Sequence, residues 1–224
     1  MKPQKYLSRH GEPEAQALSA QGLWPKAPSS PAVLQKFDYV LVLPCYDEVP
    51  TDMQRFAKFC ARNNALLIIV INQPDDIESC TNNTAAIEWI KNSQCDMLAS
   101  NISFCRVGNA SILLIDRTAM RIPKAQGVGL ARKIGADCAY ALIQQHFVEH
   151  DWIFCSDADA YLPAGYFSTP PEYTNCSAVI YPYKHIASGN DAVDKATELY
   201  EQRLRHYVEG LHRAGSPYAF HSLG

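Results

Sequence analysis

The longest apolar run of the 224-residue chain, Leu66–Ile71, consists of aliphatic residues only. A strand with one solvated face alternates apolar and polar positions, whereas an unbroken run indicates a strand buried on both faces of a parallel sheet. Tyr39–Leu43, Ser111–Asp116 and Trp152–Cys155 are three further runs that predict buried strands. Because a membrane-spanning helix needs roughly 20 apolar residues, we also expect no transmembrane segment.

Helical patterns separate these predicted strands. Val128 to about Phe147 carries apolar side chains four residues apart, and Asp191–Arg213 has a comparable apolar face. A shorter helix follows the first strand, where Thr51 or Asp52 can serve as its N-cap. This alternation predicts a doubly wound α/β fold, with a Rossmann-like, mostly parallel sheet flanked by helices. On the last helix, the side chains expected to face inward are Val193, Ala196, Tyr200, Leu204, Tyr207 and Leu211.

Three segments fit this scheme less directly. Residues 1–36 are polar and rich in proline, so we expect an N-terminal tail or surface arm before a folded domain at 37–224. Residues 77–110 are ambiguous, because Thr84–Lys91 suits a short helix while the Asn- and Ser-rich remainder indicates loops. Ala178–Tyr181 is expected to form a fifth strand.

Composition and charge exclude several classes of protein. The chain has 20 Lys and Arg against 23 Asp and Glu, a net charge of -3, so no overall field attracts nucleic acid or an anionic membrane. The N-terminal residues lack the apolar segment of a signal peptide, which predicts a cytoplasmic protein. The eight cysteines are expected to be reduced thiols, since their spacing suits neither a zinc site nor a disulfide framework.

The segment Trp152–Pro163 holds the clearest candidate for a functional site. Its predicted strand is followed at once by Asp157 and Asp159, with the small Ala158 between them. Two carboxylates suit Mg²⁺ or Mn²⁺, which bind through one or two carboxylates together with substrate phosphates. An isolated Asp-x-Asp is often only a solvated turn. Its place directly after an apolar strand favours the metal site.

A second candidate follows the first predicted strand. Pro44 ends that strand and leaves Tyr46, Asp47 and Glu48 at the edge of the sheet. These side chains suit a nucleoside, through stacking on the base and hydrogen bonds to the ribose. The alternative is an ordinary turn in which Asp47 or Glu48 lies near the N-terminus of the next helix.

A third candidate begins the long central helix. Gly127 and Gly129 permit a tight entry, and the free amides of the helix, with Lys124, Arg132 or Lys133, suit a phosphate. Arg132 stands where a dinucleotide-binding fingerprint needs its third glycine, and no Gly-Lys-Ser/Thr ends the segment as in a P-loop. The alternative is a glycine-rich helix start with exposed basic side chains.

In their order along the chain, the three motifs resemble those of the family 2 glycosyltransferases, which have the GT-A fold of nucleotide-diphospho-sugar transferases. The family has a Pro-x-Tyr-x-Glu-like loop after its first strand, a Gly-x-x-x-Ala-Arg-x-x-Gly helix and a strand that ends in an Asp-x-Asp (DXD) motif. The resemblance covers residues 38–167. The matching residues are Pro44, Tyr46 and Glu48, then Gly127, Ala131, Arg132 and Gly135, then Asp157 and Asp159.

The resemblance implies a metal-dependent glycosyltransferase that takes its sugar from a nucleotide-diphosphate sugar donor. The acceptor and the catalytic base stay unidentified. The implied donor-binding residues are Pro44, Tyr46, Glu48, Asn72, Gly127, Arg132 and Asp157. Mn²⁺ or Mg²⁺ would be held by Asp157, Asp159 and a later histidine, His221, with His185 as the second choice. Asn72 stands directly after the second strand, where the family usually has an acidic residue. The acidic residues of this loop, Asp75 and Asp76, are displaced from that position.

Two alternatives to glycosyl transfer remain open. Family members continue beyond the position of Gly224 into an acceptor site with a Glu-Asp motif, so we expect this chain to be a truncated form. Such a form would be a non-catalytic fragment that binds a nucleotide sugar. Sugar nucleotidyltransferases have a related sheet, but their first strand leads into a glycine-rich, Arg-containing loop. Pro44–Glu48 has no such sequence.

Overall fold

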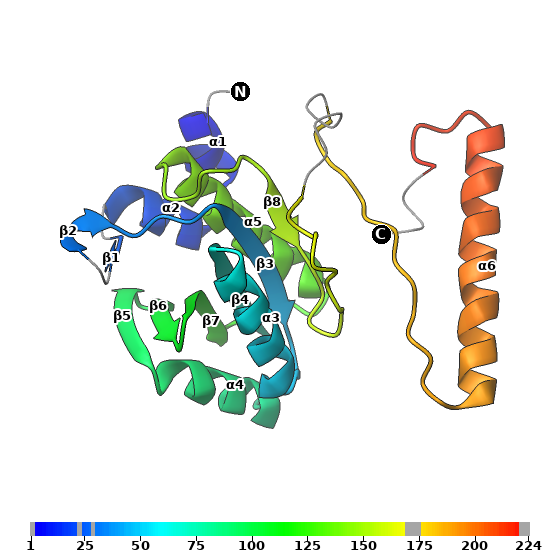
Figure 1. The fold of residues 1–224 in the computed structure, drawn as a ribbon, viewed down its shortest axis with the longest axis horizontal. Helices are drawn as coiled ribbons and strands as arrows, with labels where there is room; N and C mark the ends of the chain where they lie inside the picture. Colours follow the sequence, from blue (N-terminus) through cyan, green and yellow to red (C-terminus); the bar gives the residue numbers. More distant parts are fainter. Residues whose placement is uncertain (1–2, 22–23, 28–29, 169–175, 220–224) are drawn as a thin grey trace. The chain divides into compact units, whose positions relative to one another are not determined.

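The computed structural model describes residues 3–21, 24–27, 30–168 and 176–219 (Figure 1). The chain divides into two compact units, Met1–Phe167 and Ser168–Gly224. Within its described residues, the first unit contains a six-stranded mixed sheet flanked by helices, which confirms the predicted α/β class. The two units are described separately below.

The order of strands in the large sheet is β5-β6-β7-β4-β3-β8. Its strands are β3 (Tyr39–Cys45), β4 (Ala65–Pro74), β5 (Gln94–Ala99), β6 (Ile102–Val107), β7 (Ala110–Ile122) and β8 (Ile153–Cys155). The four strands β7, β4, β3 and β8 are parallel, and β5 and β6 add an antiparallel hairpin beside β7. A separate pair, β1 (Lys26–Ala27) and β2 (Ser30–Leu34), is antiparallel.

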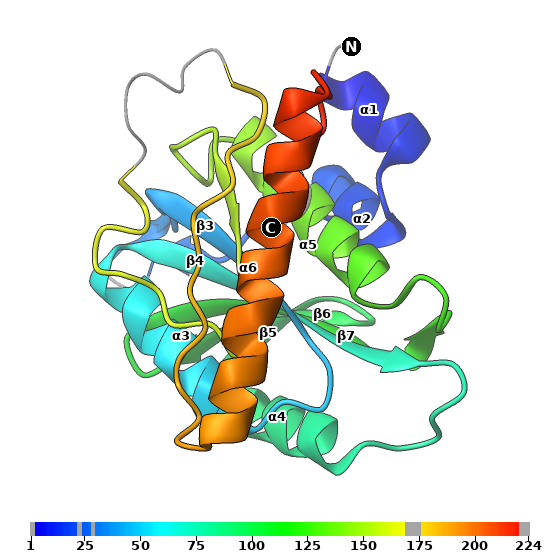
Figure 2. The same cartoon turned by 90° about the vertical axis from the view of Figure 1, so that its right-hand side faces the viewer.

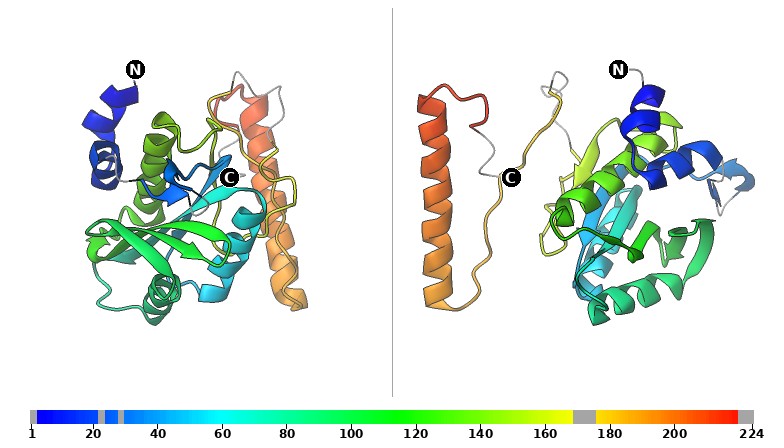
Figure 3. Two further views of the ribbon diagram at one scale, coloured as in Figure 1. Left: turned by 60° about the vertical axis from the view of Figure 1, so that its left-hand side comes forward. Right: turned by 180° about the vertical axis from the view of Figure 1, so that it is seen from behind.

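Helices cover both faces of the sheet. The helices of this unit are α1 (Pro3–His10), α2 (Pro13–Gln21), α3 (Pro50–Arg62), α4 (Thr81–Lys91) and α5 (Gly127–Gln144). Figure 2 shows α3 and α4 on one side of β4, and α5 with α1 and α2 on the other. In Figure 3, α1 and α2 lie side by side with α5.

The apolar runs explain this layered arrangement. Successive side chains of a strand point to opposite faces, so an unbroken apolar run supplies both cores. In β3, Val40 and Val42 pack in the core on the α5 side, whereas Leu41 and Leu43 pack in the core beneath α3. The predicted strand at Leu66–Ile71 divides its side chains between the two cores in the same way.

The N-terminal segment differs from the expected tail. Residues 3–21 form α1 and α2, and Leu7, Leu18 and Trp24 are buried in the core on the α5 side. A few apolar side chains in a polar sequence are enough to dock short helices on an existing core. These residues therefore belong to the first unit, rather than preceding it.

The prediction of loops around Thr84–Lys91 is confirmed for residues 77–80 but was wrong for the segment after the helix. Residues 94–107 form the hairpin of β5 and β6, and helix α4 begins three residues earlier than expected. Because β5 is an edge strand with mostly exposed or half-buried side chains, it lacks the apolar run that identified the central strands. The predicted N-cap of the helix after β3 was also wrong. Val49 is the N-cap, and Thr51 lies in the first turn.

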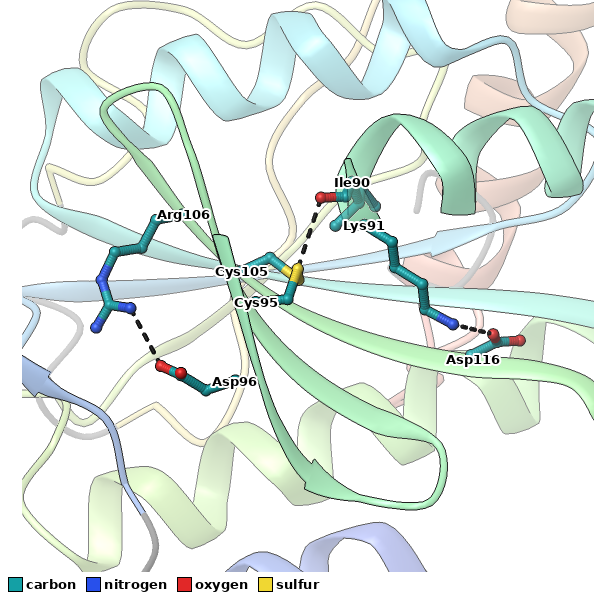
Figure 4. Close-up of a disulfide and its surroundings, with 7 residues drawn as sticks. All are labelled: Ile90, Lys91, Cys95, Asp96, Cys105, Arg106 and Asp116. Carbon is teal, nitrogen blue, oxygen red and sulfur yellow. Dashed lines mark hydrogen bonds and ion pairs between the residues drawn. A yellow bond between two sulfur atoms is a disulfide. The ribbon is translucent and has the colours of Figure 1, made fainter. Parts of the chain in front are cut away.

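Two of the cysteines predicted to be reduced form a disulfide. Cys95 and Cys105 are direct cross-strand partners in β5 and β6, and their sulfurs are bonded. Figure 4 shows this disulfide beside the C-terminal end of α4, where the Cys95 sulfur lies 3.6 Å from the carbonyl oxygen of Ile90. Reduced thiols remain at Cys45, Cys60, Cys80, Cys138, Cys155 and Cys176.

The second unit contains α6 (Asp191–Arg213), whose bounds agree with the predicted helix. Its burial pattern does not agree, because Val193, Tyr200 and Tyr207 are exposed whereas Val208 is buried. Residues 178–181 have no regular structure, so the predicted fifth strand is wrong. Across both units, none of the described helices combines the length and apolar character needed to cross a bilayer.

Candidate functional site

The topology brings the Pro44–Glu48 loop and the Asp157–Asp159 loop to one place. From β3 the chain crosses to β4 on one side, and after α5 it returns to β8 on the other side of β3. In open α/β sheets, ligands bind beyond the carboxyl ends of the strands at such a reversal. The loops that follow Cys45 and Cys155 leave the sheet at this edge.

The loop after β3 is held by hydrogen bonds around Asp47. Pro44 is part of β3 and buried, Tyr46 is 37% exposed, and Asp47 has a positive φ of 59°. The Asp47 carboxylate accepts a hydrogen bond of 2.9 Å from the Nδ2 of Asn82. The backbone nitrogen of Asp47 donates a hydrogen bond of 3.0 Å to the Oδ1 of Asn83. Asp47 therefore shapes the loop and leaves Tyr46 accessible.

The same network reaches the C-terminal end of β4. Asn83 is buried and donates from Nδ2 to the carbonyl oxygen of Asn72 over 3.1 Å. Asn72 is itself buried, and no described atom forms a hydrogen bond with its Oδ1. A buried acceptor without a partner is costly, so this amide is suited to receive a hydrogen bond from a bound molecule.

The Asp-x-Asp loop follows β8 directly. The Ser156 amide donates to the carbonyl oxygen of Val42 over 3.1 Å and extends the pairing of β8 with β3. Ala158 is buried, whereas Asp157 and Asp159 are exposed. The small residue thus faces inward and leaves both carboxylates at the surface.

The glycine-rich helix start contributes Arg132 to this site. Gly127 begins α5 with a positive φ of 40°, which a glycine adopts without steric cost. Arg132 lies in the second turn, and its Nη2 is 2.6 Å from the Oδ1 of Asp157. The structure therefore joins two motifs that are 25 residues apart in sequence.

The other basic candidates near α5 have different partners. Lys124 forms an ion pair of 2.6 Å with Asp76, and its backbone nitrogen donates to Asp75 over 3.0 Å. Lys133 binds Glu12 and Asp137, so it serves the contact with the N-terminal helices and is not directed to a phosphate site. Asp75 and Asp76 thus hold the loop before α5.

Negative charge gathers between the loops after β3 and β8. Burial raises the pKa of Glu48, and the charges of Asp159, Asp52, Asp47 and Asp157 raise it further. These carboxylates are thus close enough to repel one another. A cation bound among them would relieve that repulsion.

The residues present fit a divalent cation only in part. Asp157 and Asp159 supply the one or two carboxylates by which Mg²⁺ is usually held alongside phosphate oxygens. Among the described residues, no group of three or more His, Cys, Asp or Glu could hold a metal ion by itself. His221 lies outside the described residues, and His185 binds Glu201 in the second unit, with 2.7 Å between Nδ1 and Oε1.

Sequence patterns did not identify Arg55, which contacts the Asp-x-Asp loop. It lies on α3, and its guanidinium group donates hydrogen bonds to the carbonyl oxygens of Ala158 and Ala160. Its Cζ is 3.9 Å from the centre of the Tyr161 ring. The carbonyl groups that it binds lie more than 100 residues away in the chain, so no local pattern points to this contact.

Comparisons of the chain with protein-family models, with curated proteins and with solved structures found no match. An arginine, exposed carboxylates and an accessible tyrosine lie at the carboxyl edge of a Rossmann-like sheet. Such groups bind phosphate, cations and aromatic rings, respectively.

Proposed function

We propose that the chain is a glycosyltransferase with a GT-A fold, which binds a nucleotide-diphosphate sugar and a divalent cation at this edge of the sheet. The observation that carries the proposal is the convergence of Glu48, Arg132 and Asp157 from three separate elements. These residues belong to the three motifs that resemble family 2 glycosyltransferases. The parallel order β7-β4-β3-β8 supports the proposal, because the Pro44–Glu48 loop and the Asp157–Asp159 loop follow the adjacent strands β3 and β8.

In this proposal each residue has a distinct part in holding the donor. Tyr46 stacks on the nucleoside base, and Glu48 accepts a hydrogen bond from the ribose. Asp157 and Asp159 hold the cation, which supplies charge neutralisation on the departing diphosphate. Arg132 leaves Asp157 and binds a phosphate oxygen, because a guanidinium group pairs with phosphate as well as with carboxylate.

The test measures the affinity of UDP, GDP and ADP for the protein in Mn²⁺ and in EDTA. Wild-type protein should bind at least one of them more tightly in Mn²⁺, because the cation links the diphosphate to the carboxylates. Asp159→Ala should remove this metal-dependent gain. Asp151→Ala provides a matched control, since Asp151 is an exposed aspartate just before β8, and it should keep the gain.

Retention of the full Mn²⁺ dependence in Asp159→Ala would contradict the metal site. Binding alone does not distinguish transfer from storage of a nucleotide sugar. Release of nucleoside diphosphate from nucleotide sugars, measured with candidate acceptors, decides that point. Acceptor-dependent release supports a transferase, whereas tight binding without release supports a nucleotide-sugar-binding protein.

A further inference from the structure

Arg55 connects helix α3 to the loop that carries the two aspartates. One of its nitrogens, Nη2, is 3.1 Å from the carbonyl oxygen of Ala158, and Nη1 donates to the carbonyl oxygen of Ala160. These two carbonyl groups flank Asp159 in the chain. The planar guanidinium group thus binds the backbone on both sides of one of the proposed metal ligands.

Two further contacts fix the orientation of Arg55. Its Nη2 lies 3.4 Å from the Oδ1 of Asp52, one turn earlier on α3. The exposed ring of Tyr161 covers the guanidinium group at 3.9 Å, a cation–π distance. The side chain of Arg55 is 29% exposed, so these hydrogen bonds are partly shielded from water.

The loop makes few other backbone hydrogen bonds of its own. The Ala160 amide donates to the carbonyl oxygen of Asp157 over 3.2 Å, which closes a turn within the loop, and Ser156 is paired with β3. These bonds shape the loop locally, but they do not connect residues 158–161 to another element. Arg55 makes that connection, and its helix begins just after the loop of Tyr46 and Glu48.

We propose that Arg55 is a positioning residue that holds the Asp157–Asp159 loop against α3 and so keeps its carboxylates placed for a divalent cation. The inference rests on the proposed function for the cation, but the placement of the loop does not require a ligand. Residues that orient metal ligands without touching the metal typically contribute about 10- to 100-fold to metal affinity.

Charge and position predict opposite results for Arg55→Ala. Removal of the positive charge of Arg55 should, through the loss of Coulomb repulsion alone, strengthen the binding of Mn²⁺. Loss of the two backbone hydrogen bonds should release the loop and weaken the binding of Mn²⁺. The direction of the change therefore distinguishes a positioning residue from a residue that acts only through its charge.

The first measurement uses ligand-free protein and amide hydrogen exchange. In Arg55→Ala, residues 156–161 should exchange at least roughly tenfold faster, because local opening becomes easier. Residues of β4 should keep their wild-type rates. The matched control is Lys58→Ala, since Lys58 is an exposed cation one turn further along α3. Exchange of 156–161 at the wild-type rate in Arg55→Ala would overturn the proposal.

The second measurement is the affinity of the protein for Mn²⁺ in the presence of UDP, GDP or ADP. Electron paramagnetic resonance measures the concentration of free Mn²⁺, from which this affinity is obtained. Mn²⁺ affinity should fall by roughly 10- to 100-fold in Arg55→Ala. Arg55→Lys tests the same point with its charge retained, and it should also lose affinity, because an ammonium group lacks the planar fork of donors. Wild-type affinity in Arg55→Lys, or tighter binding in Arg55→Ala, would overturn the proposal.

These two measurements separate the inference from the function on which it rests. If wild-type protein binds no Mn²⁺ with any nucleoside diphosphate, the proposed function fails. Hydrogen exchange would then still show whether Arg55 holds the loop. If wild-type protein binds Mn²⁺ and the Arg55 variants bind it equally well, the inference fails and the proposed function stands.

Discussion

At the scale of single residues, Gly135 sets how closely α5 approaches the sheet. A Cβ atom at this position would lie 2.3 Å from Cγ1 of Val42 and 3.3 Å from Cγ2 of Val70. Both neighbours are β-branched side chains with little rotamer freedom. The close approach of α5 to β3 helps Arg132, one turn before Gly135, to reach the loop after β8.

We predict that Gly135→Ala lowers the free energy of unfolding by about 1–3 kcal/mol, because overpacking outweighs the better helix propensity of alanine. Urea denaturation measures this change. The control is Gly129→Ala on the same helix, where an added Cβ meets no described atom within 4 Å. The control should be neutral or more stable by up to about 1 kcal/mol. Equal effects of the two substitutions would contradict the steric explanation.

At the scale of elements, the disulfide stabilises the β5–β6 hairpin at the edge of the sheet. Its cysteines are separated by 10 residues and face each other in antiparallel strands. A cross-link of this length restricts the unfolded chain and, in the chain-entropy account, contributes about 2–3 kcal/mol. The arrangement compensates for the sparse burial of β5.

We predict that reduction of the wild-type protein lowers its free energy of unfolding by about 2–3 kcal/mol. Hydrogen exchange should accelerate first in residues 94–107. The variant with Cys95→Ala and Cys105→Ala should show no further loss on reduction. Cys176→Ala removes an exposed free thiol and should respond to reductant as wild type does. If reductant leaves the wild-type unfolding curve unchanged, the cross-link does not stabilise the hairpin.

At the scale of the whole first unit, a buried carboxylate joins the N-terminal helices to the layer of α5. Asp137 accepts hydrogen bonds from the Tyr6 hydroxyl over 2.9 Å, the Glu12 backbone nitrogen over 2.9 Å and the Lys133 ammonium group over 2.7 Å. Its side chain is 5% exposed. Removal of this carboxylate would leave the three donors to find other partners.

We predict that Asp137→Ala lowers the free energy of unfolding by about 1–3 kcal/mol, because three hydrogen bonds to a buried carboxylate are lost. Tyr6→Phe removes a single bond and should cost less, about 0.5–1.5 kcal/mol. In both variants, hydrogen exchange should accelerate in residues 3–21. Wild-type exchange of that segment in Asp137→Ala would show that apolar packing alone holds the helices.

Local sequence patterns predicted the elements whose signals lie within one segment of the chain. Unbroken apolar runs identified the parallel strands, since strands buried on both faces need apolar residues at every position. Helical spacing identified α6 at Asp191–Arg213 and most of α5. Polar residues directly after strands also identified the candidate site, because the carboxyl ends of parallel strands lie at one edge of a sheet.

Tertiary structure alone decided which groups meet across long stretches of chain. The Lys133–Glu12 pair and the contacts of Arg55 with the loop after β8 join residues more than 100 positions apart, which periodicity does not encode. The edge strand of the hairpin at residues 94–107 buries too few side chains for its pattern to reveal it. The disulfide likewise required the register of β5 with β6. The order of apolar and polar residues in a segment indicates how much of that segment is buried. Which other segments it contacts follows from how the whole chain packs.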